Sequence, residues 1–223
     1  MKHNSIIKVE NLVAGYGQDI ILNNITFEVH EGEIFIVLGG SGCGKSTLLK
    51  HLIGLIKPIS GSITLDGEDF SDPDDFILQK VLRKIGVLYQ SAALFGSMTI
   101  AENIALPINE YTHLPEKAVD DMVRMKMKLV GLEGYEDLPA KVLSQGQKRR
   151  VALARLLLTN ARLWILDEPF TALDVVAIEH LRDTLQAHLA AQGLVVLTTH
   201  QRVDFEPGQL RRLDMSQYSG MSQ

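Results

Sequence analysis

Gly39-Gly40-Ser41-Gly42-Cys43-Gly44-Lys45-Ser46-Thr47 is the stretch that decides the fold of this chain. It fits the spacing G-x-x-x-x-G-K-S from its first glycine onward. The residues before it, Glu33-Ile34-Phe35-Ile36-Val37-Leu38, are typical of a buried strand, and residues 45–54 are typical of a helix with leucines near one face. A strand, a glycine loop and a helix in this order predict the phosphate-binding loop of an α/β domain.

The chemistry of this stretch is that of a phosphate cradle. Its glycines allow several backbone N–H groups to converge on phosphate oxygens, and the start of the following helix adds partial positive charge. Lys45 supplies a cation for β- and γ-phosphates, and the Ser46 hydroxyl is a candidate ligand of Mg²⁺. The alternative is a chance glycine-rich turn, which leaves the lysine, the serine and both flanking elements unexplained.

A second apolar stretch, Leu163-Trp164-Ile165-Leu166-Asp167-Glu168, predicts a buried strand that ends in two acids. Ligands of parallel α/β sheets bind beside the carboxyl ends of the strands, so Asp167 is a candidate to hold Mg²⁺ through water. Glu168 is then free to polarise an attacking water as a general base. The alternative, that both acids only solvate the end of a strand, is disfavoured by the phosphate loop.

Size and composition suit one large α/β domain or a domain with one inserted lobe. The 223 residues are 46% hydrophobic, which is enough for a substantial core and argues against wholesale disorder. The net charge of −5 disfavours nucleic acid as a partner, so we interpret the basic run Lys148-Arg149-Arg150 as a solvated or partner-facing helix surface.

Cysteine usage and hydropathy indicate the compartment. Cys43 is the one cysteine, so it cannot form an internal disulfide, which fits a reducing cytosol. No apolar stretch is long enough for the core of a signal peptide or for a bilayer crossing. We therefore expect a cytoplasmic protein, and any membrane-spanning part of its system on other chains.

The pattern of elements changes twice along the chain. We expect a single domain over residues 1–223, with a core at 1–90 and 147–214 and a helical lobe at about 91–146. Residues 6–38 are expected to be rich in strands, including 24–29 and 33–38, and further strands are expected at 62–66, 163–166 and 194–198. In the second half of the chain, one helix is expected from residue 147 to about residue 158 and another at 173–191. The polar tail, residues 215–223, is expected to be frayed.

With these motifs in this order, nearly the whole chain resembles the ABC-type ATPases, the nucleotide-binding subunits of ABC transporters. The resemblance implies an α/β fold: a P-loop NTPase core of ABC type with an antiparallel β-rich portion and an inserted α-helical lobe. It also implies that ATP and Mg²⁺ are the cofactors and that ATP is hydrolysed to ADP and phosphate. The ATP-binding residues of the loop are then Gly39, Gly40, Ser41, Gly42, Cys43, Gly44, Lys45, Ser46 and Thr47.

Four single residues match functional positions of the family, in the family's order. The resemblance implies that Tyr16 stacks on adenine and that Gln90 is a catalytic sensor of Mg²⁺ and the γ-phosphate. Asp174 matches the acid that communicates across the dimer, and His200 matches the switch histidine beside the γ-phosphate. Taken singly, each has a plainer interpretation as a loop aromatic, a surface polar group or a satisfied histidine. Their order and context favour the functional roles.

The segment Leu143-Ser144-Gln145-Gly146-Gln147 matches the family's signature, normally Leu-Ser-Gly-Gly-Gln. Ser144, the backbone near Gly146 and a helix expected to begin around Gln147 form an anion-binding surface. The resemblance implies that this surface closes on ATP held by a second copy of the chain. Gln145 replaces a glycine that allows the closest backbone approach, so the fit to ATP is altered. We expect tolerance, because Gly146 remains.

The resemblance also implies the partners. Two copies would close head-to-tail as a homodimer, with each copy giving its signature to the ATP of the other. Integral membrane subunits on other chains would be driven by this cycle, so the protein would lie peripherally on the inner face of the cell membrane. Nucleic acid is not expected as a partner.

Within the family, the two halves resemble different subfamilies. Up to about residue 134, residues 93–107 and 125–132 are similar to the ATPase of bacterial lipid-asymmetry (Mla-type) transporters. Beyond it, residues 147–156, 163–172 and 198–201 are similar to the haem-exporter ATPase of cytochrome c maturation. We hypothesise a natural mosaic or an engineered hybrid with lipid or haem-type cargo. One relative that matches evenly across residue 134 would contradict this.

Three alternative functions stay open. A hybrid ATPase could hydrolyse ATP and couple poorly to either membrane partner. A non-transport ABC ATPase acting on DNA or ribosomes is disfavoured, because the chain has neither a long coiled-coil insertion nor a second cassette. A non-enzymatic scaffold of the same fold is disfavoured by the intact set of polar residues Lys45, Asp167, Glu168 and His200.

Overall fold

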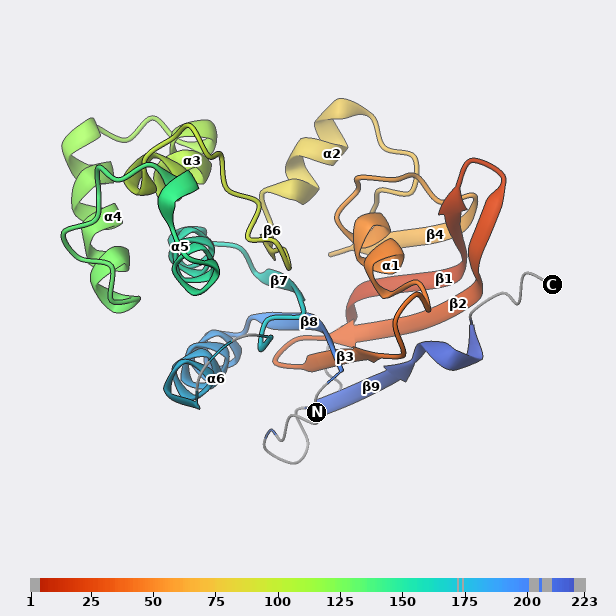
Figure 1. Ribbon diagram of the computed structural model, residues 1–223. Coiled ribbons are helices and arrows are strands. Elements are labelled where there is room, and N and C mark those ends of the chain that lie inside the picture. Colours follow the sequence, from red (N-terminus) through yellow and green to blue (C-terminus); the bar gives the residue numbers. More distant parts are fainter. Residues whose placement is uncertain (1–4, 172, 174, 201–204, 206–209, 219–223) are drawn as a thin grey trace. The chain divides into compact units, whose positions relative to one another are not determined.

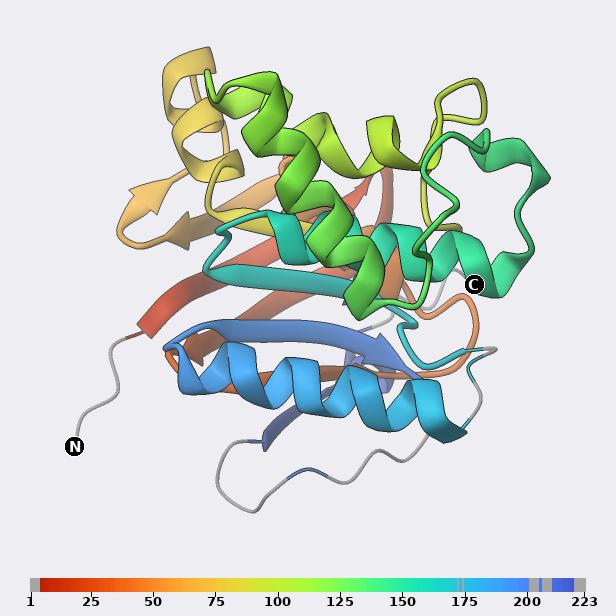
Figure 2. The ribbon, with the colours of Figure 1, turned by 90° about the vertical axis from the view of Figure 1, so that its left-hand side faces the viewer.

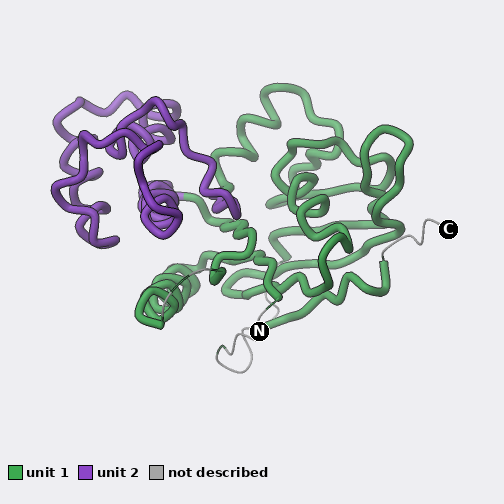
Figure 3. The backbone as a smooth tube through the Cα atoms, viewed as in Figure 1, with its two compact units in different colours: residues 1–85, 161–223 green, residues 86–160 purple. Residues whose placement is uncertain are grey.

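A computed structural model describes residues 5–171, 173, 175–200, 205 and 210–218 (Figure 1). The chain has the expected mixed α/β fold, with an antiparallel sheet, a parallel sheet and a helical segment inserted in the sequence. It divides into two compact units (Figure 3). Unit 1 comprises residues 1–85 and 161–223, and unit 2 comprises residues 86–160.

Unit 1 contains an antiparallel sheet whose strands lie in the order β2-β1-β4-β5. Strands β1 and β2 form a hairpin in which Tyr16 pairs with Asp19, and Gly17 in the turn has a φ of 60°. On β1, Val9 pairs with Phe27 of β2 and Ile63 of β4, and all three side chains are buried. The bounds are Ser5–Tyr16 (β1), Asp19–His30 (β2), Ser60–Leu65 (β4) and Glu68–Asp69 (β5).

The parallel sheet of unit 1 positions the chemistry-bearing loops. Strands β7, β8, β3 and β9 are neighbours in that order. The apolar runs of β3, β7 and β8 are buried, as expected for strands covered on both faces. The register places Asp167 opposite Thr198, and Leu38 opposite both Thr199 and Asp214, so the carboxyl ends of all four strands meet at one edge. The bounds are Ile34–Leu38 (β3), Leu163–Asp167 (β7), Leu194–Thr199 (β8) and Leu210–Asp214 (β9).

Three α-helices accompany these sheets in unit 1. Helix α1 (Lys45–Leu52) follows β3, helix α2 (Asp75–Leu82) is capped by the Asp74 side chain, and helix α6 (Val175–Ala190) runs along β8 (Figure 2). On α6 the buried side chains recur every four residues, as expected for a helix with one apolar face: Leu181, Leu185 and Leu189.

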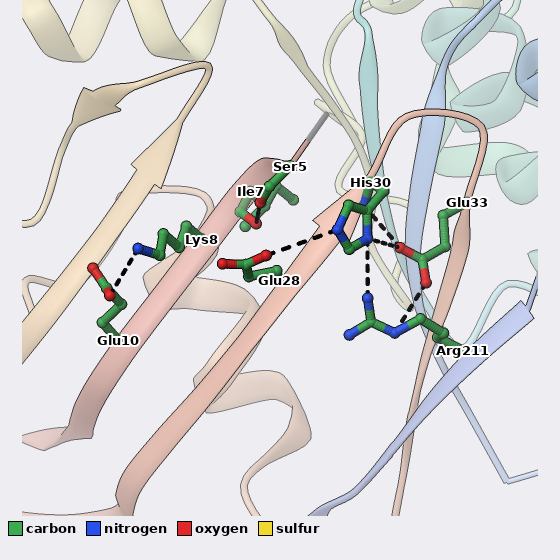
Figure 4. Close-up of polar contacts among 8 residues, drawn as sticks. All are labelled: Ser5, Ile7, Lys8, Glu10, Glu28, His30, Glu33 and Arg211. Atoms are coloured by element: carbon green, nitrogen blue, oxygen red, sulfur yellow. Dashed lines mark hydrogen bonds and ion pairs between the residues drawn. The ribbon is translucent and has the colours of Figure 1, made fainter. Parts of the chain in front are cut away.

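The segment after β8 differs from the sequence-based expectation. Strand β9 was not predicted, because its exposed charged side chains hide the strand pattern; Arg211 Nε lies 3.1 Å from Glu33 Oε1 and ties β9 to the start of β3 (Figure 4). The prediction of a frayed tail is wrong for residues 215–218. Met215 begins the 3₁₀ turn η2 (Met215–Gln217) and is fully buried, which fixes this segment. Residues 219–223 lie outside the described part.

Unit 2 is built from three helices around one apolar cluster. Helices α3 (Ile100–Tyr111), α4 (Glu116–Leu129) and α5 (Gln145–Leu158) pack on one another. Strand β6 (Ile85–Leu88) leads into this unit, and the 3₁₀ turn η1 (Ala140–Val142) precedes α5. The lobe was expected at about 91–146; the compact unit extends to residue 160, because α5 packs on α3 and α4. The buried cluster includes Ile100, Ile104, Val123, Met127, Val151 and Leu158.

Within the described ranges, none of the helices has both the length and the hydrophobicity that a membrane crossing requires.

Candidate functional site

The glycine loop begins where β3 ends and delivers the chain to α1. Gly44 caps this helix with a φ of 92°, and a Cβ on it would lie 2.5 Å from Leu22 Cδ2, so only glycine fits. Glycine offers no side chain to the first N–H groups of α1. These donors are therefore available to an anion, as the sequence predicts.

Lys45 turns its ammonium group back onto the loop. Nζ donates to the carbonyl oxygens of Gly39 at 2.7 Å and Gly40 at 2.9 Å, and it lies 4.0 Å from Cys43 Sγ. The residue is 7% exposed. A cation at the centre of the loop is available to phosphate oxygens, which would replace the two carbonyls as its acceptors.

Asp167, at the end of β7, contacts two hydroxyl groups. Ser46 Oγ donates to Asp167 Oδ2 at 3.4 Å, and Thr198 Oγ1 donates to Asp167 Oδ1 at 2.7 Å. A serine hydroxyl beside a carboxylate fits Mg²⁺, which prefers oxygen ligands and takes much of its shell from phosphate and water. In the described part of the chain, no cluster of three or more His, Cys, Asp or Glu residues could hold a metal ion, so the site does not form a cage of its own.

Glu168 follows directly and adopts an unusual backbone conformation. Its φ is 51°, in the left-handed region, and the residue is 6% exposed. The Glu168 N–H donates to Thr198 Oγ1 at 2.9 Å, and Glu168 Oε1 lies 2.8 Å from His200 Nε2. A buried carboxylate beside an imidazole can accept a proton from water and share it with the ring.

Thr198 is the residue that the sequence-based interpretation missed. Its hydroxyl accepts from Glu168 and donates to Asp167, and the side chain is fully buried. The signal was present: a threonine ends an apolar run next to the predicted acidic strand. Only the register, which sets Asp167 opposite Thr198, reveals its use.

Tyr16 lies at the end of β1 against α1. Its hydroxyl accepts from Lys50 Nζ at 3.0 Å, and hydrogen bonds from Lys50 and then Thr47 lower the pKa of this phenol. The ring is partly exposed, and the Lys50 ammonium lies 5.4 Å from its centroid. An exposed ring near the loop suits the predicted stacking on a base, which stays a prediction.

The signature segment lies in unit 2 at the start of α5. Ser144 Oγ accepts from the N–H of Gln147 at 3.3 Å, and Gln147 Oε1 accepts from the N–H of Ser144 at 2.9 Å. This capping box starts the helix at Gln145, earlier than the expected start around Gln147, and it places Gly146 inside the first turn. Both Ser144 and Gln145 are exposed and available to another molecule.

The predicted site residues thus fall into two groups. Unit 1 joins Ser46, Asp167, Glu168 and His200 in one network that lies at the carboxyl edge of the parallel sheet. Unit 2 carries Gln90, which is exposed, and the signature residues. Asp174 lies outside the described residues. The roles assigned to all of these residues stay predictions.

Comparison with known proteins supports a specific family. Residues 22–171 match the model of the ABC transporter family. The chain is 40% identical over 174 residues to the intermembrane phospholipid transport ATP-binding protein MlaF of Haemophilus influenzae, covering 78% of this chain and 66% of that protein. It is 39% identical over 207 residues to the cytochrome c biogenesis ATP-binding export protein CcmA of Nitrosomonas europaea, covering 89% and 90%.

Solved structures agree with this family. The chain superposes with a TM-score of 0.81, at 31% identity and 88% coverage of both chains, on a dimeric ATP-binding cassette in a post-hydrolysis state bound to ADP and phosphate. It also resembles cbiO1 of Clostridium perfringens, part of the transporter complex cbiONQ, with a TM-score of 0.73, 32% identity and coverage of 89% and 79%.

The mosaic hypothesis gains no support from these relatives. Alignments over 78% and 89% of this chain have to cross residue 134, and the identities to the MlaF and CcmA proteins are nearly equal. A hybrid origin is therefore unconfirmed.

Proposed function

Because the chain belongs to the family of ABC transporter ATP-binding domains, we propose that it is the ATP-hydrolysing subunit of a transporter whose membrane subunits are separate chains. ATP hydrolysis is the activity of this family, and a related cassette was solved with ADP and phosphate. The likeness to MlaF and CcmA proteins makes a lipid or a haem-type molecule the proposed cargo.

One observation carries the catalytic part of the proposal. Ser46, Asp167, Glu168 and His200 come from distant segments, yet continuous polar contacts through Thr198 join them beside the Lys45 loop. Isolated acids at a strand end would not need a buried hydroxyl between them. Such a network is expected where charge develops on a transferred phosphoryl group.

Each residue then has a defined task. The loop N–H groups and Lys45 bind the β- and γ-phosphates. Ser46 and Asp167 would hold the Mg²⁺ that accompanies the nucleotide. Mg²⁺, when bound there, would neutralise phosphate charge. Glu168 orients the attacking water and accepts its proton, and His200, 2.8 Å away, stabilises the charge that forms.

The proposed partner is a second copy of the chain. Ser144 and Gln145 are exposed, and the capping box leaves them preformed for contact. Closure of two copies would bring this surface onto the γ-phosphate and exclude water. Gln90 would report the presence of Mg²⁺ and the γ-phosphate. We propose a peripheral location at the cytoplasmic face of the cell membrane, on membrane subunits of the phospholipid or haem type.

The test is phosphate release from ATP by the purified protein. Turnover that requires both ATP and Mg²⁺, and that EDTA stops, supports the proposal; absence of turnover under these conditions overturns it. The cargo is tested separately by purifying the tagged protein from membranes and measuring the phospholipid and haem content of the complex. Recovery of the tagged protein without membrane subunits would contradict only the transport part of the proposal.

A further inference from the structure

The segment that follows Gln90 has a strained backbone. Ala92 and Ala93 both have positive φ values, 65° and 46°. Non-glycine residues in this region cost about 1 kcal/mol or more each, so two in succession persist only where neighbouring groups impose them. This strain lies directly beside the residue proposed to sense Mg²⁺ and the γ-phosphate.

Arg155 of α5 contacts both strained residues. Its Nη2 donates to the Ala92 carbonyl at 3.0 Å, and its Nη1 donates to the Ala93 carbonyl at 3.0 Å. A guanidinium group holds two acceptors in a fixed geometry, which an ammonium group cannot do. Desolvation by burial lowers the pKa of Arg155, with a smaller opposing effect of Tyr89. The two carbonyls offset the cost of burying this cation.

Other contacts complete the hold on this segment. Asn103 is fully buried; its Oδ1 accepts from the N–H of Phe95 at 2.8 Å, and its Nδ2 donates to the Phe95 carbonyl at 3.0 Å. The N–H of Ala92 donates to the Tyr89 carbonyl at 2.9 Å. Arg149 contacts the Gln90 carbonyl at a longer 3.4 Å. The two contacts of Arg155, at 3.0 Å each, are shorter than this one.

Helix α5 carries the signature at its other end. Ser144 is its N-cap, and Arg155 lies eleven residues further on, which corresponds to about 16 Å along a rigid helix. Val151 and Leu158 anchor the helix in the apolar cluster of unit 2. Arg155 thus joins the Gln90 segment to the same helix that presents Ser144.

We propose that Arg155 is a positioning residue, which sets the backbone around Gln90 and ties that glutamine to the signature helix. The proposal rests on the proposed ATPase function. It assigns a purpose to the strain at Ala92 and Ala93, since the strained turn brings both carbonyls within reach of one side chain. No direct contact between Arg155 and the nucleotide is required.

The same helix supplies a matched control. Arg150 Nη1 contacts the carbonyls of Val130 and Gly131, both at 3.4 Å, at the end of α4. It is also an α5 arginine that holds carbonyl oxygens of unit 2, but these carbonyls lie at the end of α4 and not in the Gln90 segment. A purely structural effect on the helical unit would be shared by Arg150→Lys and Arg155→Lys.

The experiment is a double-mutant cycle with Gln90→Ala. Arg155→Lys keeps the charge but loses the planar guanidinium that donates to both carbonyls. The kcat at saturating ATP is therefore expected to fall about tenfold in the wild-type background. In the Gln90→Ala background the same change is expected to alter kcat by less than about twofold, because its effect passes through Gln90. Arg150→Lys is expected to leave kcat close to the background value in both.

A second readout does not depend on turnover. Hydrogen exchange of the amides of Ala92 and Phe95 should speed up in Arg155→Lys and in the shape-conserving Arg155→Met, but not in Arg150→Lys. Unchanged hydrogen exchange in Arg155→Lys, or equal losses of kcat in both backgrounds, overturns the proposed role of Arg155. As long as the wild-type protein hydrolyses ATP, these results leave the proposed function intact. If the wild-type protein shows no ATP turnover, the proposed function is overturned, and with it the proposed role of Arg155 in catalysis.

Discussion

In unit 1 the predicted site residues come from separate segments and are joined by tertiary hydrogen bonds, whereas in unit 2 the signature is held by its own helix end. Thr198 joins Asp167 to Glu168 across two strands, while Ser144 and Gln147 satisfy each other three residues apart. The first arrangement is a chemical centre whose polar groups, including the buried Glu168 and Thr198, are joined within one unit. The second is an exposed, preformed surface that awaits a ligand from elsewhere. The difference fits the proposal that the exposed surface of one copy complements the centre of another.

The largest effect is expected from Glu168→Gln. An amide cannot accept the proton of water, so kcat should fall by about 10²–10⁴-fold, while ATP binding is preserved. The trapped ATP should favour a stable dimer, which size-exclusion chromatography with and without ATP would detect. Glu133→Gln, at an exposed acid of unit 2, is the control. Turnover like that of the wild type in Glu168→Gln would rule out Glu168 as the base.

The next effect is expected from Lys45→Ala. Loss of the ammonium group inside the loop removes charge-assisted bonds to phosphate, so the Kd for ATP should rise by about 10–100-fold. Titration calorimetry measures this, with Lys57→Ala at an exposed lysine as the control. An unchanged affinity would show that the cradle does not use its lysine.

Thr198→Val tests the tertiary character of the centre in unit 1. Valine keeps the shape but leaves the N–H of Glu168 without the hydroxyl acceptor, so kcat should fall about tenfold and the melting temperature should drop. Thr184→Val is the control, since Thr184 bonds only its own helix at the His180 carbonyl. Equal activity of both variants would mean that Thr198 serves packing alone.

The smallest effect is expected from Gln145→Gly. Gln145 occupies the first turn of α5, so glycine restores the family pattern at a cost of up to about 1 kcal/mol in helix stability. We expect kcat to change by less than about threefold, because Gly146 already permits close approach. Steady-state turnover and a thermal melt measure both effects. A rise in kcat of an order of magnitude would show that Gln145 limits the contact with the partner.

The features that the sequence predicted, and those that it did not, follow the same division between local and tertiary contacts. Motifs that depend on local spacing were predicted: the glycine loop and the acidic strand. Features that depend on register were not. Strand β9 has few apolar side chains of its own, yet it pairs with β3, and the buried Met215 follows it directly. Arg155 sits in an apolar helix run, and only the fold brings it to the Ala92 and Ala93 carbonyls.

The start of α5 is a local feature that the sequence-based prediction nevertheless placed inexactly. The sequence indicated a helix around Gln147, but reciprocal side-chain bonds between Ser144 and Gln147 start it at Gln145. The capping pattern Ser-x-x-Gln was visible in the sequence and would have given the start, because this pair satisfies two backbone donors at once.

The central claim, that the centre of one copy is completed by the signature of another, is tested most directly by mixing two variants. Lys45→Ala disables the loop, and Ser144→Asp keeps a good helix cap while placing negative charge toward the partner's phosphate. Each variant alone should show almost no turnover. After mixing at equal amounts, one intact composite site in each heterodimer should restore about a quarter of wild-type turnover. Turnover of the mixture no higher than that of the separate variants would contradict the claim.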